Sequence, residues 1–301
     1  MHGLLLIDKP SGLTSHDIVR RVRRLFKTRR VGHAGTLDPL ASGVLPVALG
    51  EATRLLQFLL ADDKAYRATA RLGVTTDTLD ADGEILEERP VPEISQGQLE
   101  RVLQCFRGAI EQIPPMYSAL KQNGVPLYKL ARQGETVERQ PRRVTIHSLK
   151  LLSFAPPFLQ LEVHCSKGTY IRSLLADIGE ELGCGAHLTA LRRTASAGFE
   201  AAECIALADL ENLDDPHQAL LTPLQAMRAY PVVELNADAV KALHFGIPPQ
   251  AAEATSQFAG EDGATVCLAA ADQLLAMARY APRREREKRG DFELLKVFVR
   301  A

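Results

Sequence analysis

The chain of 301 residues is long enough for two domains, since single domains usually span about 100–200 residues. Hydrophobic residues make up 46% of it and charged residues 24%, which is ordinary for a globular protein that buries a substantial core. The formal net charge of -1 favours no class of ligand, so any site for a polyanion must depend on local charge.

The cysteines and the N-terminal segment argue against several other classes of protein. The five cysteines are scattered and form no C-x-x-C pair: Cys105, Cys165, Cys184, Cys204 and Cys267. This pattern argues against a disulfide framework and against a zinc site. The apolar run Leu4–Ile7 is too short for a signal peptide, and no stretch approaches the ~20 apolar residues of a membrane span. We therefore expect a cytoplasmic protein with reduced thiols that does not enter a membrane.

The first half of the chain predicts short helices and strands. Ile18, Val22 and Leu25 follow the i, i+4, i+7 spacing of one helix face, and Thr14 or Ser15 is suited to cap that helix. In chain order we expect a strand at Gly3–Ile7, helices at Ser15–Phe26 and Glu51–Leu60, a strand at Ala65–Leu72, an acidic turn at Thr76–Glu84, and helices at Gln98–Phe106 and Leu127–Gln133.

The second half adds a pair of adjacent strands, one helix and a strand-rich C-terminal segment. The expected elements are strands at Val144–Leu152 and Leu159–Cys165, a helix at Tyr170–Leu182, and strands at His187–Ala195, Pro231–Leu235, Thr265–Ala270, Leu274–Tyr280 and Phe292–Val299. Helices and strands mix without regular β-α-β order, which favours an α+β fold. A polar stretch before Tyr230 predicts a domain boundary near residue 225, which divides the chain into 1–225 and a small β-rich unit of 226–301.

Cationic side chains are concentrated in two short segments. Seven basic residues and no acidic residue lie between Arg20 and Arg30. The second cluster lies near the C-terminus: Arg283, Arg284, Arg286, Lys288 and Arg289. Such clusters form a phosphate-binding footprint on a neutral protein, because charges act over a screening length of ~8 Å. The same pattern is typical of a solvated helix face, so charge alone leaves both interpretations open.

The segment from Gly32 to Pro46, GHAGTLDPLASGVLP, carries the most specific pattern in the chain. Its glycines and prolines predict a shaped loop rather than a regular helix or a central strand. Pro39 restricts the backbone of Asp38 to extended angles, so the carboxyl group is held in one geometry. A rigid loop with one histidine, His33, and one aspartate indicates an active-site loop, although an ordinary Asp-Pro turn has the same local features.

This motif resembles the catalytic motif of the TruB family of pseudouridine synthases. Further segments resemble the family in the same order: Leu6–Gly12, Asp63–Arg67, Leu72–Gly83, Pro114–Lys121, Cys165–Leu174 and Gly185–Arg193. The resemblance is strong up to about residue 200 and weak over the C-terminal segment, where the family carries a small PUA-like RNA-binding domain. It implies a catalytic fold with a mixed, mainly antiparallel sheet flanked by helices.

The resemblance also implies a reaction. Enzymes of this family detach uracil from its ribose, rotate the base and rejoin it through C5, with no metal or organic cofactor. The family nucleophile maps to Asp38, which must be ionised to attack, and the arginine that the family places beside it maps to Arg172. Attack on the ribose C1′ and attack on uracil C6 both remain open.

Three pocket residues follow from the same resemblance. Tyr66 matches a tyrosine that stacks on the target uracil, Tyr170 matches a second active-site tyrosine, and Leu191 matches an apolar pocket wall. Without the family motif, all three side chains are typical of core or edge packing.

The implied substrate is the T stem-loop of tRNA. Its target uridine is stacked and paired, so it must be flipped out, and His33 matches the family residue that disrupts or fills the vacated position. Lys9 and Lys64 are expected to contact phosphates. We expect a monomer with no obligatory protein partner.

Three alternative functions meet a specific objection. A non-catalytic RNA-binding protein on this fold should have lost at least one of Asp38, Tyr66 and Arg172, and all three are present. A guide-directed synthase of other RNAs is disfavoured because long Lys-rich tails are missing. A carboxylate glycosidase needs two acids that flank the bond, and Asp38 has no such companion in a comparable motif.

The acidic turn also resembles a calcium-binding loop, through Asp77, Asp80 and Asp82. An alignment on the following glycine puts Thr78 at the first position and Arg89 at the twelfth, where a calcium loop requires acids. We therefore expect no calcium site there, and the resemblance implies a structural, RNA-facing loop.

Overall fold

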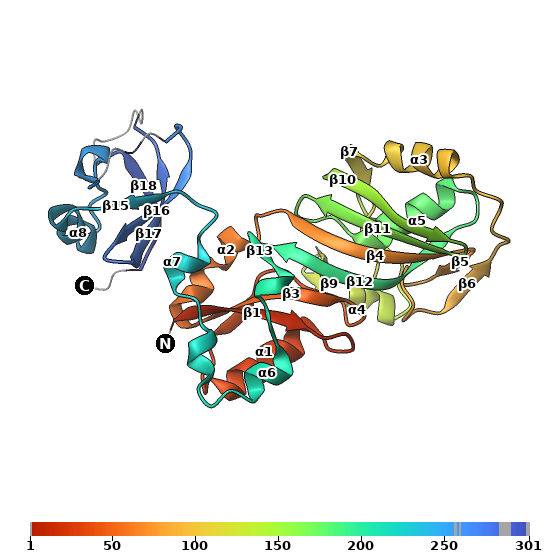
Figure 1. The fold of residues 1–301 in the computed structure, drawn as a ribbon, viewed down its shortest axis with the longest axis horizontal. Coiled ribbons are helices and arrows are strands. Elements are labelled where there is room, and N and C mark those ends of the chain that lie inside the picture. The colour runs from red at the N-terminus through yellow and green to blue at the C-terminus, as the bar shows by residue number, and fades with distance from the viewer. Residues whose placement is uncertain (1, 256–257, 259, 283–289, 299–301) are drawn as a thin grey trace.

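A mixed sheet forms the main body of the protein (Figure 1). The computed structural model describes residues 2–255, 258, 260–282 and 290–298. The strand order is β14-β1-β3-β12-β4-β11-β10-β7, with β2 paired to β3 and β13 paired to β12. The strands are β1 (Gly3–Lys9), β2 (Val31–His33), β3 (Ser42–Leu49), β4 (Lys64–Leu72), β7 (Gly108–Gln112), β10 (Arg142–Ala155), β11 (Phe158–Cys165), β12 (Ala186–Ser196), β13 (Phe199–Glu200) and β14 (Ile205–Ala206). Only the β1–β14 and β3–β12 pairs are parallel, which confirms a mixed, mainly antiparallel sheet.

The three longest helices of the main body pack into one core with this sheet: α1 (Ser15–Leu25), α3 (Gln96–Cys105) and α5 (Ile171–Glu181). The Thr14 side chain accepts a hydrogen bond from the Asp17 backbone N–H, and the Asp17 carboxylate accepts one from the Thr14 backbone N–H, so a capping box begins α1. Ile18 and Val22 on the inner face of this helix are fully buried, as their spacing predicts. The predicted α+β fold is therefore confirmed.

Several predicted elements differ in extent or kind. Residues 50–59 form a 3-10 helix, η1 (Gly50–Leu55), and one turn, α2 (Leu56–Leu59), in place of a regular helix. The Thr53 hydroxyl donates to the Gly50 carbonyl at 2.7 Å, a local bond that competes with regular helix bonding. The predicted neighbours β10 and β11 do form an antiparallel pair, joined through a cis Pro156–Pro157 bond.

The prediction that residues 32–46 exclude a central strand is wrong. β3 lies inside the sheet between β1 and β12, and only residues 34–41 form the loop. Gly43 has a φ of 102°, and a Cβ there would lie 2.8 Å from the Arg193 backbone nitrogen, so only glycine allows β12 to approach. The Pro46 carbonyl accepts from Ala34 N just beyond the β2–β3 ladder, where the missing proline N–H leaves no strand partner unsatisfied.

A second sheet lies at one end of the elongated molecule, opposite to α3 (Figure 1). It comprises β15 (Val232–Glu234), β16 (Thr265–Ala270), β17 (Gln273–Tyr280) and β18 (Phe292–Val297), with α8 (Ala237–His244) beside it. The predicted strand at 292–299 thus ends at 297, and its last residue lies outside the described residues. Met277 of this sheet packs in one cluster with Leu55 and Phe58 of the main body, and the Tyr230 hydroxyl donates to the Phe58 carbonyl at 3.2 Å. This C-terminal sheet is consistent with a PUA-like domain.

The remaining elements are short. They are β5 (Val74–Thr76), β6 (Ile85–Glu88), β8 (Lys121–Gln122), β9 (Val125–Pro126), α4 (Leu127–Arg132), η2 (Ala201–Glu203), α6 (Leu207–Glu211), η3 (Pro216–Ala219), α7 (Pro223–Ala226) and η4 (Ala251–Glu253). Across the part of the chain that the structure describes, no helix has both the length and the apolar character needed to cross a bilayer. The basic cluster at residues 283–289 lies outside the described residues.

Candidate active site

The loop of residues 34–41 connects β2 to β3 and carries Asp38. The start of α1 holds it, because Ser15 Oγ accepts from Leu37 N at 2.8 Å. The turn before α1 holds it a second time, through Gly12 N and the Pro39 carbonyl at 2.8 Å. Asp38 is therefore fixed on both sides by neighbouring backbone contacts.

Arg172, in the first turn of α5, lies directly beside this carboxylate. Its Nε is 3.1 Å from Asp38 Oδ2, and its Nη2 is 3.4 Å from Asp38 Oδ1. Its Nη1 lies 3.2 Å from Asp80 Oδ2, so one guanidinium is shared by two carboxylates. The side chains of Arg172 and Asp80 are almost fully buried, whereas that of Asp38 is 35% exposed. The geometry thus leaves Asp38 accessible and hides its counter-ion.

Backbone carbonyls and a glutamine fix the position of Arg172. Its Nη1 donates to the Thr78 carbonyl at 2.9 Å and its Nη2 to the Tyr117 carbonyl at 2.7 Å. Just before α5, Tyr170 N donates to Gln112 Oε1 at 2.7 Å, and Gln112 Nε2 donates to the Tyr170 carbonyl at 3.0 Å. Since Gln112 is buried at the end of β7, it ties the start of α5 to the sheet edge.

The charge state of Asp38 follows from two opposing effects. Burial raises the pKa of its carboxyl group, because a low-dielectric environment disfavours the anion. The Arg172 guanidinium opposes this rise in the Asp38 pKa, and the Asp80 carboxylate adds to it. The net pKa lies above its ordinary value, so Asp38 is a stronger base than an exposed aspartate.

A cavity of about 280 Å³ opens above Asp38 and Arg172. It brings together four other residues that the motifs single out from distant parts of the chain: Lys64, Tyr66, Tyr170 and Leu191. Burial raises the pKa of the Tyr66 phenol, and the Arg193 guanidinium opposes that rise. The cavity joins apolar walls to the Asp38–Arg172 pair and to three further cationic side chains, Lys64, Lys167 and Arg193, as expected of a site for a small polar ligand.

The two lysines predicted as phosphate contacts are both buried. Lys9 is 0% exposed, and its Nζ donates to the carbonyls of Pro10 at 2.9 Å and Leu13 at 2.6 Å. Burial lowers the pKa of Lys9 to about 8. The prediction of a phosphate contact is therefore at odds with the burial of Lys9, whose ammonium group stabilises the turn before α1. Lys64 donates to two backbone carbonyls but also lines the cavity.

His33 lies at the end of β2 and is not among the residues that line the cavity. Its Nδ1 is buried without a hydrogen-bond partner among the described residues. Burial lowers the pKa of its imidazole, and Arg193 lowers it further, so the neutral form is favoured. Nδ1 is thus shielded, and His33 lies beside the Asp38 loop rather than in the cavity wall.

The basic segment of residues 20–30, which begins on α1, is partly neutralised. Arg20 pairs with Asp17, Arg21 pairs with Glu211 at 3.4 Å, and Arg30 pairs with Glu51. Such exposed pairs contribute little to stability, but they reduce the positive potential of the segment. The predicted phosphate footprint is therefore smaller than its seven cations suggest.

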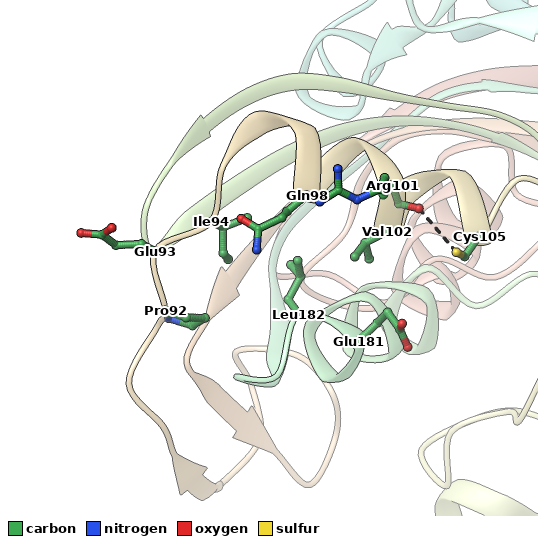
Figure 2. A pocket seen from close by; sticks show the side chains of 9 residues that line it. All are labelled: Pro92, Glu93, Ile94, Gln98, Arg101, Val102, Cys105, Glu181 and Leu182. Atoms are coloured by element: carbon green, nitrogen blue, oxygen red, sulfur yellow. Dashed lines mark hydrogen bonds between the residues drawn. The ribbon is translucent and has the colours of Figure 1, made fainter.

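A second hollow, of about 460 Å³, lies between α3 and the C-terminal end of α5 (Figure 2). It is lined by Pro92, Glu93, Ile94, Gln98, Arg101, Val102, Cys105, Glu181 and Leu182. The Cys105 thiol donates to the Arg101 carbonyl at 3.4 Å, and none of the predicted site residues lies there. The charged groups of this hollow do not converge on one point (Figure 2), so we place the active site at Asp38.

Three residues near the cavity were not identified from the sequence: Asp80, Gln112 and Arg193. Each acts through a partner that is distant in the chain, so no local spacing reveals it. The acidic turn did single out Asp80, but as a rejected calcium ligand. No group of three or more metal-ligating side chains suited to an ion is found among the residues that the structure describes.

Comparison with known proteins shows which family the chain belongs to. Residues 23–171 match the N-terminal domain of TruB family pseudouridylate synthases, and residues 172–227 match the tRNA pseudouridylate synthase B C-terminal domain. A Syntrophotalea carbinolica protein named tRNA pseudouridine synthase B is 52% identical over 300 residues, covering 99% of this chain and 98% of the relative. The chain belongs to the TruB family of pseudouridylate synthases. It is therefore an isomerase.

Other TruB relatives and two solved structures extend this result. A Coxiella burnetii protein, also named tRNA pseudouridine synthase B, is 47% identical and covers 95% of each chain. A crystal structure of a Cbf5-Nop10-Gar1 complex matches with a TM-score of 0.78 and 29% identity, covering 99% of this chain and 85% of that one. The structure of an H/ACA RNP bound to a substrate RNA containing 2'-deoxyuridine matches with a TM-score of 0.77 and 27% identity. The predicted pseudouridine-synthase fold is therefore confirmed.

Proposed function

We propose that this TruB family member converts U55 in the T loop of tRNA to pseudouridine, with Asp38 as the covalent nucleophile. The central support is the placement of the Asp38 carboxylate, which is partly exposed at the cavity and bonded to Arg172. Relatives that are 47–52% identical over nearly the whole chain bear the name tRNA pseudouridine synthase B. These two observations, one chemical and one evolutionary, point to the same activity.

Arg172 has a double role in this proposal. It keeps Asp38 ionised against the effect of burial, so that the carboxylate is able to attack. When a covalent ester forms, Asp38 loses its charge, and a buried guanidinium without a partner would be costly. Asp80 remains beside Arg172 at that stage, so the cation stays paired throughout the reaction.

Tyr66, Tyr170 and Leu191 form the walls that receive the flipped uracil in this proposal. An aromatic ring stacks on any base, which suits Tyr66 to hold uracil while it detaches and turns. His33, beside the loop that carries Asp38, is proposed to occupy the position that the flipped base leaves. Lys64 is retained as an RNA contact because its side chain lines the cavity.

The proposal includes the organisation of the protein. We infer that residues 1–225 form the catalytic domain and that residues 226–301 form an RNA-binding domain. The protein is proposed to act in the cytoplasm as a monomer without an obligatory protein partner. A guide-directed synthase of other RNAs is the competing function, favoured by the likeness to the complexes of Cbf5 and the H/ACA RNP. It is disfavoured by the higher identity to relatives that are named alone.

One assay separates these functions. The purified chain is incubated with an unmodified tRNA transcript that carries tritium at uracil C5, and tritium release and the modified position are measured. Rapid release from U55, in the absence of guide RNA and other proteins, is expected. A transcript with cytidine at this position is the matched control, and light scattering gives the oligomeric state. No release from the uridine transcript by a folded, tRNA-binding enzyme would contradict the proposal.

A further inference from the structure

Arg193 is a buried cation that the mechanism above does not use. It lies in β12, its relative exposure is 1%, and it lines the wall of the cavity. Buried charges are normally paired with an opposite charge, because desolvation of an isolated cation is costly. Among the described residues no carboxylate pairs with this guanidinium, so other contacts must account for its position.

Two of these contacts join Arg193 to the segment that carries Asp38. Its Nε donates to the Val44 carbonyl at 2.7 Å, and its Nη2 donates to the Gly35 carbonyl at 3.2 Å. Gly35 lies three residues before Asp38, and the arginine Nη1 would be only 3.3 Å from a Cβ placed on it. The guanidinium therefore contacts the backbone on both sides of Asp38 in the sequence.

The third contact concerns Tyr66. Arg193 and Tyr66 are direct cross-strand partners in the β12–β4 ladder, so their side chains lie next to each other on one sheet face. Both line the cavity, and the Arg193 guanidinium opposes the rise that burial causes in the pKa of the Tyr66 phenol. The other titratable groups that face this phenol are Cys165 from β11 and Asp38 from the loop.

We propose that Arg193 is a positioning residue that binds the Tyr66 hydroxyl oxygen and so directs the hydroxyl proton toward the uracil site. A guanidinium has only donors, so it occupies an acceptor position of the phenol oxygen. The phenol proton must then be donated to another acceptor, and the group that faces it across the cavity is the bound uracil. This inference therefore rests on the proposed function. The cation also favours the phenolate, which opposes the effect of burial.

A double-mutant cycle tests the contact independently of activity. Arg193→Gln removes the charge, and Tyr66→Phe removes only the hydroxyl. Urea denaturation of both single variants, the double variant and the native enzyme gives the coupling between the two groups. We expect the unfolding constant to deviate from additivity by about tenfold, as for groups in direct contact. Simple additivity would overturn the proposal, because it would restrict Arg193 to its backbone contacts.

Arg192 supplies a matched control. It is the adjacent residue of β12, but its guanidinium binds Asp8 of β1 at 2.7 and 3.0 Å and its side chain is 41% exposed. Arg192→Gln combined with Tyr66→Phe is expected to be additive. If Arg193→Gln does not fold, Arg193→Met, which removes the donors and keeps an aliphatic side chain, replaces it in the same cycle.

A kinetic cycle tests the role of the contact. Arg193→Gln is expected to slow single-turnover isomerisation about 100-fold in the native enzyme and less than about 3-fold in the Tyr66→Phe enzyme, with tRNA affinity unchanged. Equal slowing in both backgrounds would overturn the role through Tyr66. If the native enzyme makes no pseudouridine in tRNA, the proposed function fails, while the denaturation cycle still reports on the contact.

Discussion

The loop that carries Asp38 and the turn that carries Asp80 lie on two sides of Arg172, and they hold their carboxylates differently. Asp80 Oδ1 accepts from the Thr78 hydroxyl at 2.6 Å and from the Asp82 N–H at 3.2 Å, and its side chain is only 7% exposed. The Asp38 side chain is 35% exposed, and among the described residues its carboxylate bonds to Arg172 alone. The Asp80 carboxylate therefore accepts three hydrogen bonds, which makes it a poorer nucleophile than the less satisfied Asp38. Asp80 is thus suited to support Arg172, and Asp38 is suited to react.

Contacts hold the backbone of both segments, but they direct the two side chains differently. The Thr76 hydroxyl donates to the Asp80 carbonyl at 2.7 Å, and Leu188 N donates to the Leu79 carbonyl at 3.0 Å, which ties the turn to β12. Leu79 has a φ of 63°, which a leucine adopts only when its surroundings enforce it. The turn is thus built to hold Asp80 still, whereas the Asp38 loop presents its side chain to the cavity.

The strongest test of this division replaces Asp38. Asp38→Asn is expected to abolish isomerisation, by about 10⁴-fold or more in a single-turnover assay, because an amide is not a nucleophile. The affinity for tRNA, measured by filter binding, should stay close to the native value. Stability at neutral pH should not fall, because burial raises the pKa of Asp38, so its anion opposes folding above that pKa. Appreciable pseudouridine from this variant would rule out Asp38 as the nucleophile.

The next largest effect is expected at the shared cation. Arg172→Met removes the group that keeps Asp38 ionised, and it leaves Asp80 buried without its cation. We expect kcat to fall about 1,000-fold with a much smaller change in tRNA affinity, together with a loss of about 3–5 kcal/mol of stability. Arg172→Lys keeps the charge but loses the planar guanidinium that binds two carboxylates at once, so it should recover part of the stability and little of the rate. A fall in affinity alone would identify Arg172 as a phosphate clamp.

A third prediction concerns the Asp80 side of the comparison. Asp80→Asn should reduce kcat about 100-fold, because Arg172 loses the contact that fixes its orientation. Rates should fall on acidification as Asp38 becomes protonated. Since the Asp80 charge raises the pKa of Asp38, the acid limb of the pH–rate profile should move to lower pH in this variant. A limb that moves to higher pH would show that Asp80 does not act on the charge of Asp38.

The residues that line the cavity around Asp38 were predictable from the sequence, because each of them belongs to a contiguous motif. The motifs placed Asp38, Tyr66, Tyr170, Arg172 and Leu191 in one site, and the structure brings all five to one cavity. Asp38 and Arg172 are 134 positions apart, so the resemblance to a family, rather than local spacing, made this prediction possible. Their catalytic roles remain proposals.

The role of Asp80 as a support for Arg172 was not predictable, because the contact joins residues that are distant in the sequence. Arg172 and Asp80 are 92 positions apart, and the acidic turn has the composition of any solvated loop. Gly43 and Pro46 suggested a break in the sheet, but a close strand approach and the end of a ladder accommodate them in β3. In both cases the structure of the segment depends on a residue that is distant in the sequence, and a local sequence pattern carries no information about that residue.

The smallest expected effect concerns Thr78, whose side chain bonds to Asp80 and not to Asp38 or Arg172. Its hydroxyl donates to Asp80 Oδ1, while its carbonyl accepts from Arg172 Nη1, so Thr78→Val removes the first contact and leaves the second in place. One hydrogen bond to a partly buried carboxylate contributes about 1–3 kcal/mol, and we expect a loss of stability in that range on urea denaturation. The single-turnover rate should fall only a few-fold, because Arg172 still holds Asp38.

Thr78→Ser provides the control for this last prediction, because it keeps the hydroxyl and removes only a methyl group. It should match the native enzyme in rate and lose little stability. If Thr78→Val were as slow as the Asp80 variant, Thr78 and Asp80 would act as one unit on Arg172. If Thr78→Val changed neither rate nor stability, the turn would not depend on this bond. The contrast between Asp80, which the turn holds, and Asp38, which the cavity exposes, would then lose its physical basis.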